Sequence, residues 1–352
     1  HFSISPHLNH RHIAKSAFTR YRFFDVFLKG KGTFPKRPEL SVNLKTANGI
    51  PIASVSPHDV GQVQNVQIFY SINPHSLTRF WRRAATAKHR NNWIAHLPIL
   101  STDMPLFVMA NVEYPQPQQL IGSRHMGNSP ENFLISSWET IIDPTALKKA
   151  GVKAIDRPDR IIQRSFDDWG DWYQVSWGNH QHAVAGTRKL TDPKWRGPDG
   201  ATLSIDVKDP QGGYFLMAFD VNNWGAYPGL AKGGYYCVKA LAKTEDWQTV
   251  TIKLSDLKPR GSGISDRPKS WQGITELQIV AGLHRIPGEE KTILSGGTWP
   301  GKRELRNLQW IGGKYSSPLL YPGGKLSIEE FQKIFQADID KSIELEIHDT
   351  QK

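Results

Sequence analysis

Four histidines lie close together at the start of the chain, and their type and spacing are the first sign of chemistry. His1, His7, His10 and His12 fall within a single short run. Histidine is the commonest metal ligand and a frequent general base near neutral pH. The run therefore fits a metal site or a loop with one functional histidine, although no carboxylates accompany it. A loop histidine held only by hydrogen bonds or solvent is the third interpretation.

The nucleophile that a histidine base would serve is not found among the familiar motifs. No Gly-x-Ser-x-Gly pentapeptide occurs, and Gly261-Ser262-Gly263 has the wrong spacing. A phosphate-binding Walker loop, a His-Glu-x-x-His motif and a dinucleotide fingerprint are also absent from the sequence. Because a general base needs a nucleophile within hydrogen-bond reach, His10 alone cannot catalyse acyl transfer. We expect no complete catalytic site in this chain.

The composition favours a β-rich protein, and its charge suits an acidic partner or simply solubility. The 352 residues include 30 glycines, 23 prolines and 12 tryptophans, which suits many turns and sandwich cores with buried indoles. The net charge of +11 suits acidic polymers, or simply solubility, and its basic clusters are too short to favour nucleic acid. The single cysteine, Cys237, excludes an internal disulfide and a cysteine-based zinc site. No apolar run is long enough to predict a membrane span.

Apolar periodicity predicts a helix and then a small sandwich in the first third of the chain. Ala17, Tyr21, Phe24 and Leu28 share one helical face within a first unit, residues 1–36. Residues 38–115 alternate as strands, most regularly from Leu106 onward. We expect an antiparallel sandwich there, of fibronectin or immunoglobulin type.

The remaining chain predicts a linker and a second, larger sandwich. Residues 116–160 read as a linker with short helices at 131–142 and 144–150. The turn-rich region that follows predicts a jelly roll, and a capped helix is expected at 327–335 in the tail, so the last domain spans 161–352. Its expected strands are 161–166, 172–177, 202–207, 214–220, 234–242, 248–254, 276–282 and 305–311.

Several aromatic residues of this region lie among turn residues and are candidates to stack on a sugar ring. These candidate ligand-binding residues are Trp195, Trp224, Tyr227 and Trp299. The alternative is that they fold back as lids on the core. The tryptophans that lie inside strand runs are expected in the core: Trp172, Trp177, Trp247 and Trp310.

Three carboxylates precede one of the expected strands. Asp167, Asp168 and Asp171 lie close enough in sequence to hold a structural calcium ion through carboxylate and carbonyl oxygens. No complete calcium-loop signature accompanies them. A pair of carboxylates across a cleft, as in a glycosidase, is a further alternative that sequence alone does not address.

Several sequence segments in the first third of the chain resemble the end of an α/β-hydrolase domain and the sandwich that follows it. The run from Ser5 to His10, followed by FFDVFLKGKG at 23–32, resembles the catalytic-histidine loop and closing helix of prolyl-oligopeptidase-like and dienelactone-hydrolase-like enzymes. VQIFYSINPHSLTRFWRRA at 66–84 and PLFVMANVEY at 105–114 resemble the sandwich that follows the hydrolase domain in PhoPQ-activated pathogenicity-related proteins. The resemblance implies that His10, or else His12, is the catalytic histidine. The nucleophile and acid of that family would lie outside the chain.

The second sandwich has a resemblance of its own. DDWGDWYQVSW at 167–177 and DWQTVTIKLSDLK at 246–258 resemble jelly-roll carbohydrate-binding modules and the related sandwich of complex I intermediate-associated proteins. This resemblance implies a fold more than a ligand.

Three functions follow as expectations. The first is a non-catalytic C-terminal region of a bacterial α/β hydrolase that binds a polysaccharide or oligosaccharide, possibly acidic, and is exported to the periplasm or beyond. The second is a serine-type esterase or peptidase in which His10 completes a site supplied by the missing upstream domain. The third is a sandwich-fold enzyme acting on polysaccharide through Tyr, His or Arg. Apart from calcium, we expect no cofactor.

Overall fold

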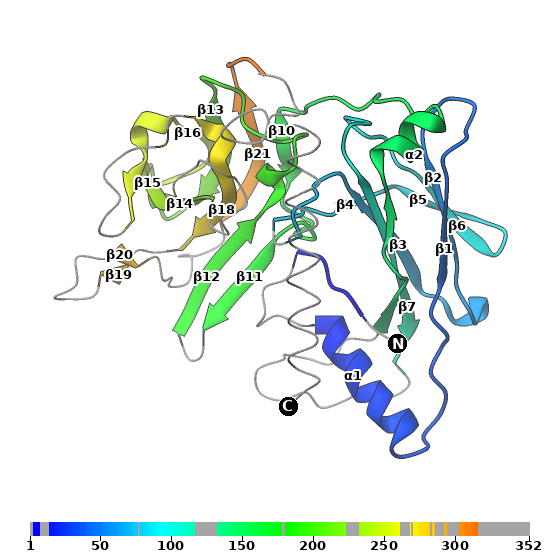
Figure 1. Ribbon diagram of the computed structural model, residues 1–352. Coiled ribbons are helices and arrows are strands. Elements are labelled where there is room, and N and C mark those ends of the chain that lie inside the picture. The colour runs from blue at the N-terminus through cyan, green and yellow to red at the C-terminus, as the bar shows by residue number, and fades with distance from the viewer. Residues whose placement is uncertain are drawn as a thin grey trace, which may run out of the picture. The chain divides into compact units, whose positions relative to one another are not determined.

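A computed structural model describes residues 3–7, 14–76, 78–116, 132–177, 180–222, 232–260, 268, 270–281, 284–285, 292–293 and 303–315. The chain divides into two compact units: unit 1 comprises residues 1–73 and 81–156, and unit 2 comprises residues 74–80 and 157–352. The chain is mainly β, its sheets are antiparallel, and they build two β-sandwiches (Figure 1). None of the described helices is long and apolar enough to span a bilayer.

Unit 1 contains two sheets. The first has the strand order β1-β2-β6-β5 and the second the order β4-β3-β7-β8, with β9 also paired to β7. The strands are β1 (Glu39–Asn43), β2 (Ile52–Ser56), β3 (Asn65–Ser71), β4 (Arg82–Arg83), β5 (Thr86–His89), β6 (Asn92–His96), β7 (Leu106–Pro115), β8 (Asn132–Ser136) and β9 (Thr140–Ile142).

Strand β7 is buried on both of its faces. The predicted alternation from Leu106 is present, but every residue from Leu106 to Tyr114 is buried. One reason is an N-terminal segment that hydrogen-bonds to the face that carries Asn111. Asn111 Nδ2 donates to the Ile4 carbonyl at 2.9 Å, and Ser136 Oγ accepts from Ile4 N at 2.7 Å. The polar residues of β7 are therefore part of the packing rather than solvent-facing.

The predicted helix at 131–142 is wrong, because this stretch pairs with β7 instead. Asn111 of β7 and Ser136 of β8 are register partners, and β9 joins the other half of β7. The second predicted helix is confirmed as α2 (Pro144–Lys149). Its start follows the usual rules: Pro144 occupies the first turn, and Asp143 caps the helix by accepting from Ala146 N at 2.9 Å.

The helix predicted near the N-terminus is confirmed as α1 (Ala14–Phe27). It contacts β8 through Thr19, whose Oγ1 donates to the Leu134 carbonyl at 2.7 Å. Part of its apolar surface is not covered, since Phe27 and Leu28 remain 54% and 75% exposed.

Unit 2 also contains two large sheets. One has the order β10-β21-β13-β16 and the other the order β11-β12-β18-β14-β15-β17, and β19-β20 form a separate hairpin (Figure 1). The strands are β10 (Ile161–Ser165), β11 (Tyr173–Trp177), β12 (His180–Thr187), β13 (Thr202–Asp209), β14 (Gly213–Val221), β15 (Gly233–Leu241), β16 (Thr244–Ile252), β17 (Lys258–Pro259), β18 (Ile274–Val280), β19 (His284–Arg285), β20 (Thr292–Ile293) and β21 (Glu304–Ile311).

The core of unit 2 takes one face from each large sheet. In β14 the odd-numbered residues Phe215, Met217 and Phe219 are buried in this core, together with residues of the other sheet such as Leu203 and Ile205. The even-numbered residues of β14 therefore lie on the opposite face of the six-stranded sheet, which we call its outer face.

Residues 74–80 also belong to unit 2, where Thr191 Oγ1 donates to the Thr78 carbonyl at 2.7 Å.

Candidate functional site

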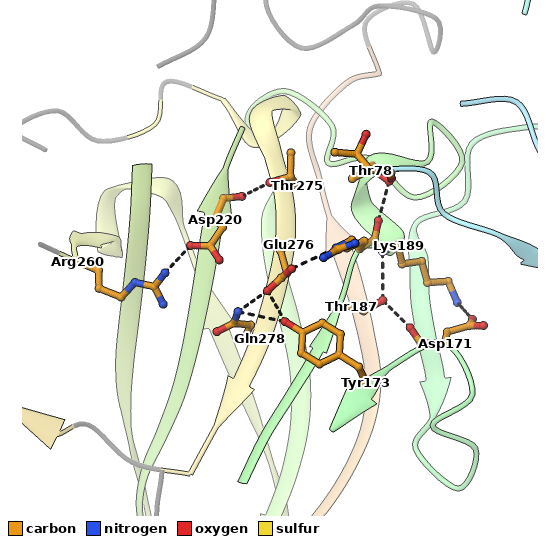
Figure 2. Close-up of polar contacts among 12 residues, drawn as sticks. Thr78, Asp171, Tyr173, Thr187, Lys189, Asp220, Arg260, Thr275, Glu276 and Gln278 are labelled. Carbon is orange, nitrogen blue, oxygen red and sulfur yellow. Dashed lines mark hydrogen bonds and ion pairs between the residues drawn. The ribbon is translucent and has the colours of Figure 1, made fainter. Parts of the chain in front are cut away.

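Two carboxylates lie side by side on the outer face of the six-stranded sheet. Asp220 of β14 and Glu276 of β18 are register partners, so their side chains point to the same side of neighbouring strands (Figure 2). Both are largely buried, with residue exposures of 7% and 5%. A buried carboxylate is costly unless it is paired, so the donors around this carboxylate pair define the site.

Glu276 is held by donors from three sides. Tyr173 OH and Gln278 Nε2 both donate to Oε1 (Figure 2). Arg188 Nε lies 3.4 Å from Oε2. Gln278 Nε2 also lies 3.3 Å from the Tyr173 oxygen, which closes the network. Burial, together with the nearby charge of Glu276, raises the pKa of Tyr173, so the phenol stays protonated and remains a donor.

Asp220 has one strong partner. Arg260 Nη2 donates to Oδ1 at 2.7 Å, whereas Oδ2 receives no hydrogen bond from any residue in the described ranges. Burial raises the pKa of Asp220 to about 6; the Arg260 guanidinium opposes this shift, and the negative charge of Glu276 adds to it. Asp220 is thus mostly ionised at neutral pH but close to taking up a proton.

Two glycines allow the donors to reach the carboxylates across the sheet. Tyr173 crosses Gly186 of β12, where an added Cβ would lie 2.4 Å from the phenol ring. Arg260 crosses Gly234 of β15, where a Cβ would lie 2.8 Å from Nε. Tyr173 and Arg260 thus reach inward from opposite edges of the six-stranded sheet. Each crosses a glycine and donates to one carboxylate of the central strands.

Comparison with known protein families, curated proteins and solved structures gives no match for this chain. The function of this chain is therefore inferred from the site itself.

The three predicted calcium ligands have separate hydrogen-bonding roles. Asp171 Oδ2 pairs with Lys189 Nζ at 2.8 Å, Asp168 Oδ1 accepts from Gly170 N at 2.8 Å, and Asp167 Oδ2 accepts from Ser165 Oγ. No group of three or more His, Cys, Asp or Glu residues arranged for a metal occurs among the described residues. The calcium prediction gains no support here, because these side chains serve local turns and an ion pair.

Trp195 is half-buried against the core of unit 2 rather than open on a loop. Its ring meets Phe80 edge-on at 5.6 Å, and Lys189 Nζ lies 4.4 Å from its centroid. Its carbonyl accepts from Trp310 Nε1 at 2.9 Å. This matches the lid alternative better than a ligand platform. The other candidate ligand-binding residues, Trp224, Tyr227 and Trp299, lie outside the described residues.

The predictions that four tryptophans lie in the core have three different outcomes. Trp172 and Trp310 are buried, which confirms those two predictions. The side chain of Trp177 lies outside the described part. The prediction for Trp247 is wrong: it lies on the outer side of β16, where Arg306 stacks 4.0 Å from its ring centroid. Trp271, which the sequence analysis did not single out, is fully buried in the core.

The N-terminal histidine prediction is largely outside the described residues, since these exclude His1, His10 and His12. His7 is described, and its Nε2 lies 2.7 Å from the Trp81 carbonyl. That contact fits the interpretation of a loop histidine held by a hydrogen bond.

None of the residues that surround the carboxylate pair was predicted from the sequence. One weak signal was present, because Glu276 and Gln278 alternate with the apolar residues Leu277 and Ile279. Such a pattern ordinarily indicates a solvent-facing side of a strand. Among the described residues this set consists of Tyr173, Arg188, Asp220, Arg260, Glu276 and Gln278, which we call the polar cluster.

Proposed function

We propose that unit 2 is a carbohydrate-binding module of the jelly-roll type and that the polar cluster on its outer face contacts the sugar. The observation that carries this proposal is the buried carboxylate pair, held by donors that reach it over glycines. The chain as a whole would then be an ancillary region of a larger exported α/β hydrolase, with unit 1 as a fibronectin-like or immunoglobulin-like sandwich.

The energetic cost of the polar cluster supports a functional role. Replacing a buried ion pair with apolar residues of similar size is often neutral or stabilising. The outer face already uses that solution at Leu216, Ala218 and Val280, which form a small buried apolar cluster beside the polar one. A sheet face that packs well with apolar side chains does not need Asp220 and Glu276 for stability.

The chemistry of the polar cluster suits sugar hydroxyls. Carboxylates, amides and guanidinium groups are planar and present several hydrogen-bonding positions with defined directions. Tyr236, half-buried in the adjoining apolar cluster, adds an aromatic surface for C–H groups. Rigid strands carry most of these side chains, so little conformational entropy would be lost on binding.

Binding of a polysaccharide panel to the whole chain tests the proposal. We expect affinity electrophoresis to show retardation by at least one polysaccharide and calorimetry with its oligosaccharide to show that Gln278→Ala weakens binding about tenfold or more, since a lost hydrogen bond to a charged partner is worth about 1.5–3 kcal/mol. Gln278 is chosen because its amide contacts both Tyr173 and Glu276.

Gln309→Ala is the matched control. Gln309 is also a half-buried strand glutamine of unit 2, but it lies in β21 of the other sheet. It should bind as the unmodified protein does. If no polysaccharide binds, or if both variants bind equally well, the proposal fails.

A second candidate function follows from α1. This helix keeps Phe24 and Phe27 exposed by 42% and 54%, although aromatic contacts of Phe23, Phe27 and Phe34 continue toward Phe133. An apolar face of this kind supports the proposal that α1 closes a hydrolase domain, with His10 as the catalytic histidine and the nucleophile outside this chain.

An esterase assay separates the two candidates. We expect the chain alone to show no turnover of activated esters, because the sequence holds no nucleophile motif that a histidine base could activate. Turnover that is abolished by His10→Ala would mean that the chain holds a complete catalytic site, and the ancillary role would be wrong.

A further inference from the structure

We infer that the polar cluster selects a neutral sugar with adjacent hydroxyl groups and discriminates against acidic sugars. This inference rests on the proposed carbohydrate-binding function and specifies its ligand class. It also runs against the net charge of +11, which by itself would favour an acidic polymer.

One carboxylate oxygen of the pair, Asp220 Oδ2, accepts no hydrogen bond from the described residues. Asp220 is nevertheless only 7% exposed. On the neighbouring strand, the 3.4 Å contact with Arg188 is the only one that Oε2 of Glu276 makes with a described residue. The carboxylate pair therefore offers two adjacent acceptor positions that call for donors from outside the cluster.

The charges within the polar cluster are balanced. Within the polar cluster two carboxylates are balanced by two guanidinium groups, Arg188 on Glu276 and Arg260 on Asp220. Lys258 lies beyond Tyr236 on the edge strand, where it is exposed to solvent and screened. Among the described residues, the charges around the polar cluster are thus balanced, although the net charge of the whole chain is +11.

Anionic, cationic and neutral sugars would interact differently with the charges of the polar cluster. An added carboxylate or sulfate would face Asp220 and Glu276. Burial, and to a smaller extent the negative charge of Glu276, already raises the pKa of Asp220. An added ammonium group would face two arginines. Neighbouring hydroxyls on a sugar ring donate hydrogen bonds without adding charge, and they match two acceptors on adjacent strands, where opposing Cβ atoms lie about 5 Å apart.

Polymers that share a backbone and differ in charge test this inference. Dextran with dextran sulfate, hydroxyethyl cellulose with carboxymethyl cellulose, and chitin oligomers with chitosan oligomers provide neutral, anionic and cationic arms. For each polymer we measure, at physiological salt, how much affinity the Gln278→Ala variant loses relative to the unmodified protein. Non-specific attraction of an anionic polymer to a basic protein does not depend on Gln278, so this loss reports binding at the polar cluster.

We expect site-dependent binding to a neutral polymer to be about tenfold or more tighter than to its charged counterpart. Asp220→Asn should raise the affinity for the matching anionic polymer several-fold, since it removes one negative charge and leaves Arg260 without its partner.

The outcomes distinguish this inference from the function on which it rests. If an anionic or cationic polymer binds more tightly and Gln278→Ala weakens that binding, the binding site stands and the neutral-sugar inference is overturned. If no polymer shows binding that depends on Gln278, the proposed function itself fails.

Discussion

Arg303→Met is expected to lower the free energy of unfolding of unit 2 by about 3–5 kcal/mol, because it leaves a buried carboxylate without its partner. Arg303 Nη2 lies 2.7 Å from Asp209 Oδ2, and the two side chains are only 2% and 0% exposed. Arg303 also donates to the Tyr214 carbonyl at 3.1 Å, so it joins the start of β21 to β13 and β14. Urea unfolding followed by intrinsic tryptophan fluorescence, to which the buried Trp271 and Trp310 of unit 2 contribute, measures the change.

The double variant Arg303→Met with Asp209→Leu is the control. Removing both charges leaves no uncompensated ion, so most of the lost stability should return. If the double variant is less stable than Arg303→Met alone, the loss comes from packing around Arg303 and the electrostatic explanation is wrong.

Gly186→Ala is expected to damage the polar cluster although it adds only a methyl group. The new Cβ would lie 2.4 Å from the Tyr173 ring, so the ring must move and its phenol must leave Glu276. A buried carboxylate that loses a donor costs about 1–3 kcal/mol. We expect that loss of stability together with weaker sugar binding, measured by urea unfolding and calorimetry.

Two further variants isolate the cause. Gly61→Ala should be close to neutral, because nothing lies within 4 Å of its added Cβ. In a Tyr173→Ala background, Gly186→Ala should cost little or even stabilise, since the clash is gone and alanine suits a strand better than glycine. A full loss in that background would show that the glycine serves the backbone rather than Tyr173.

Much of the fold could be predicted from the sequence because burial leaves a periodic pattern. The expected strand at 214–220 corresponds to β14, in which Phe215, Met217 and Phe219 alternate into the core. The pattern misled where tertiary pairing overrides local preference. Residues 131–142 look helical, but β7 offers two unsatisfied stretches of backbone that β8 and β9 fill.

The candidate site could not be predicted for a related reason. Asp220 and Glu276 become neighbours only through the register of β14 with β18, which joins residues far apart in the sequence. Trp247 shows the same limit, since only the fold reveals that its strand position faces Arg306 rather than the core. Aromatic residues drew attention to the loops, whereas the polar cluster lies mainly on strands.

A crystal structure of the chain with the tightest-binding oligosaccharide tests the central claim most directly. We predict a sugar ring on the outer face of the six-stranded sheet, with adjacent hydroxyls within hydrogen-bond distance of the carboxylates of Asp220 and Glu276. A sugar bound elsewhere, with the hydrogen bonds of Tyr173, Gln278 and Arg260 unchanged and no contact to the carboxylate pair, would contradict the account.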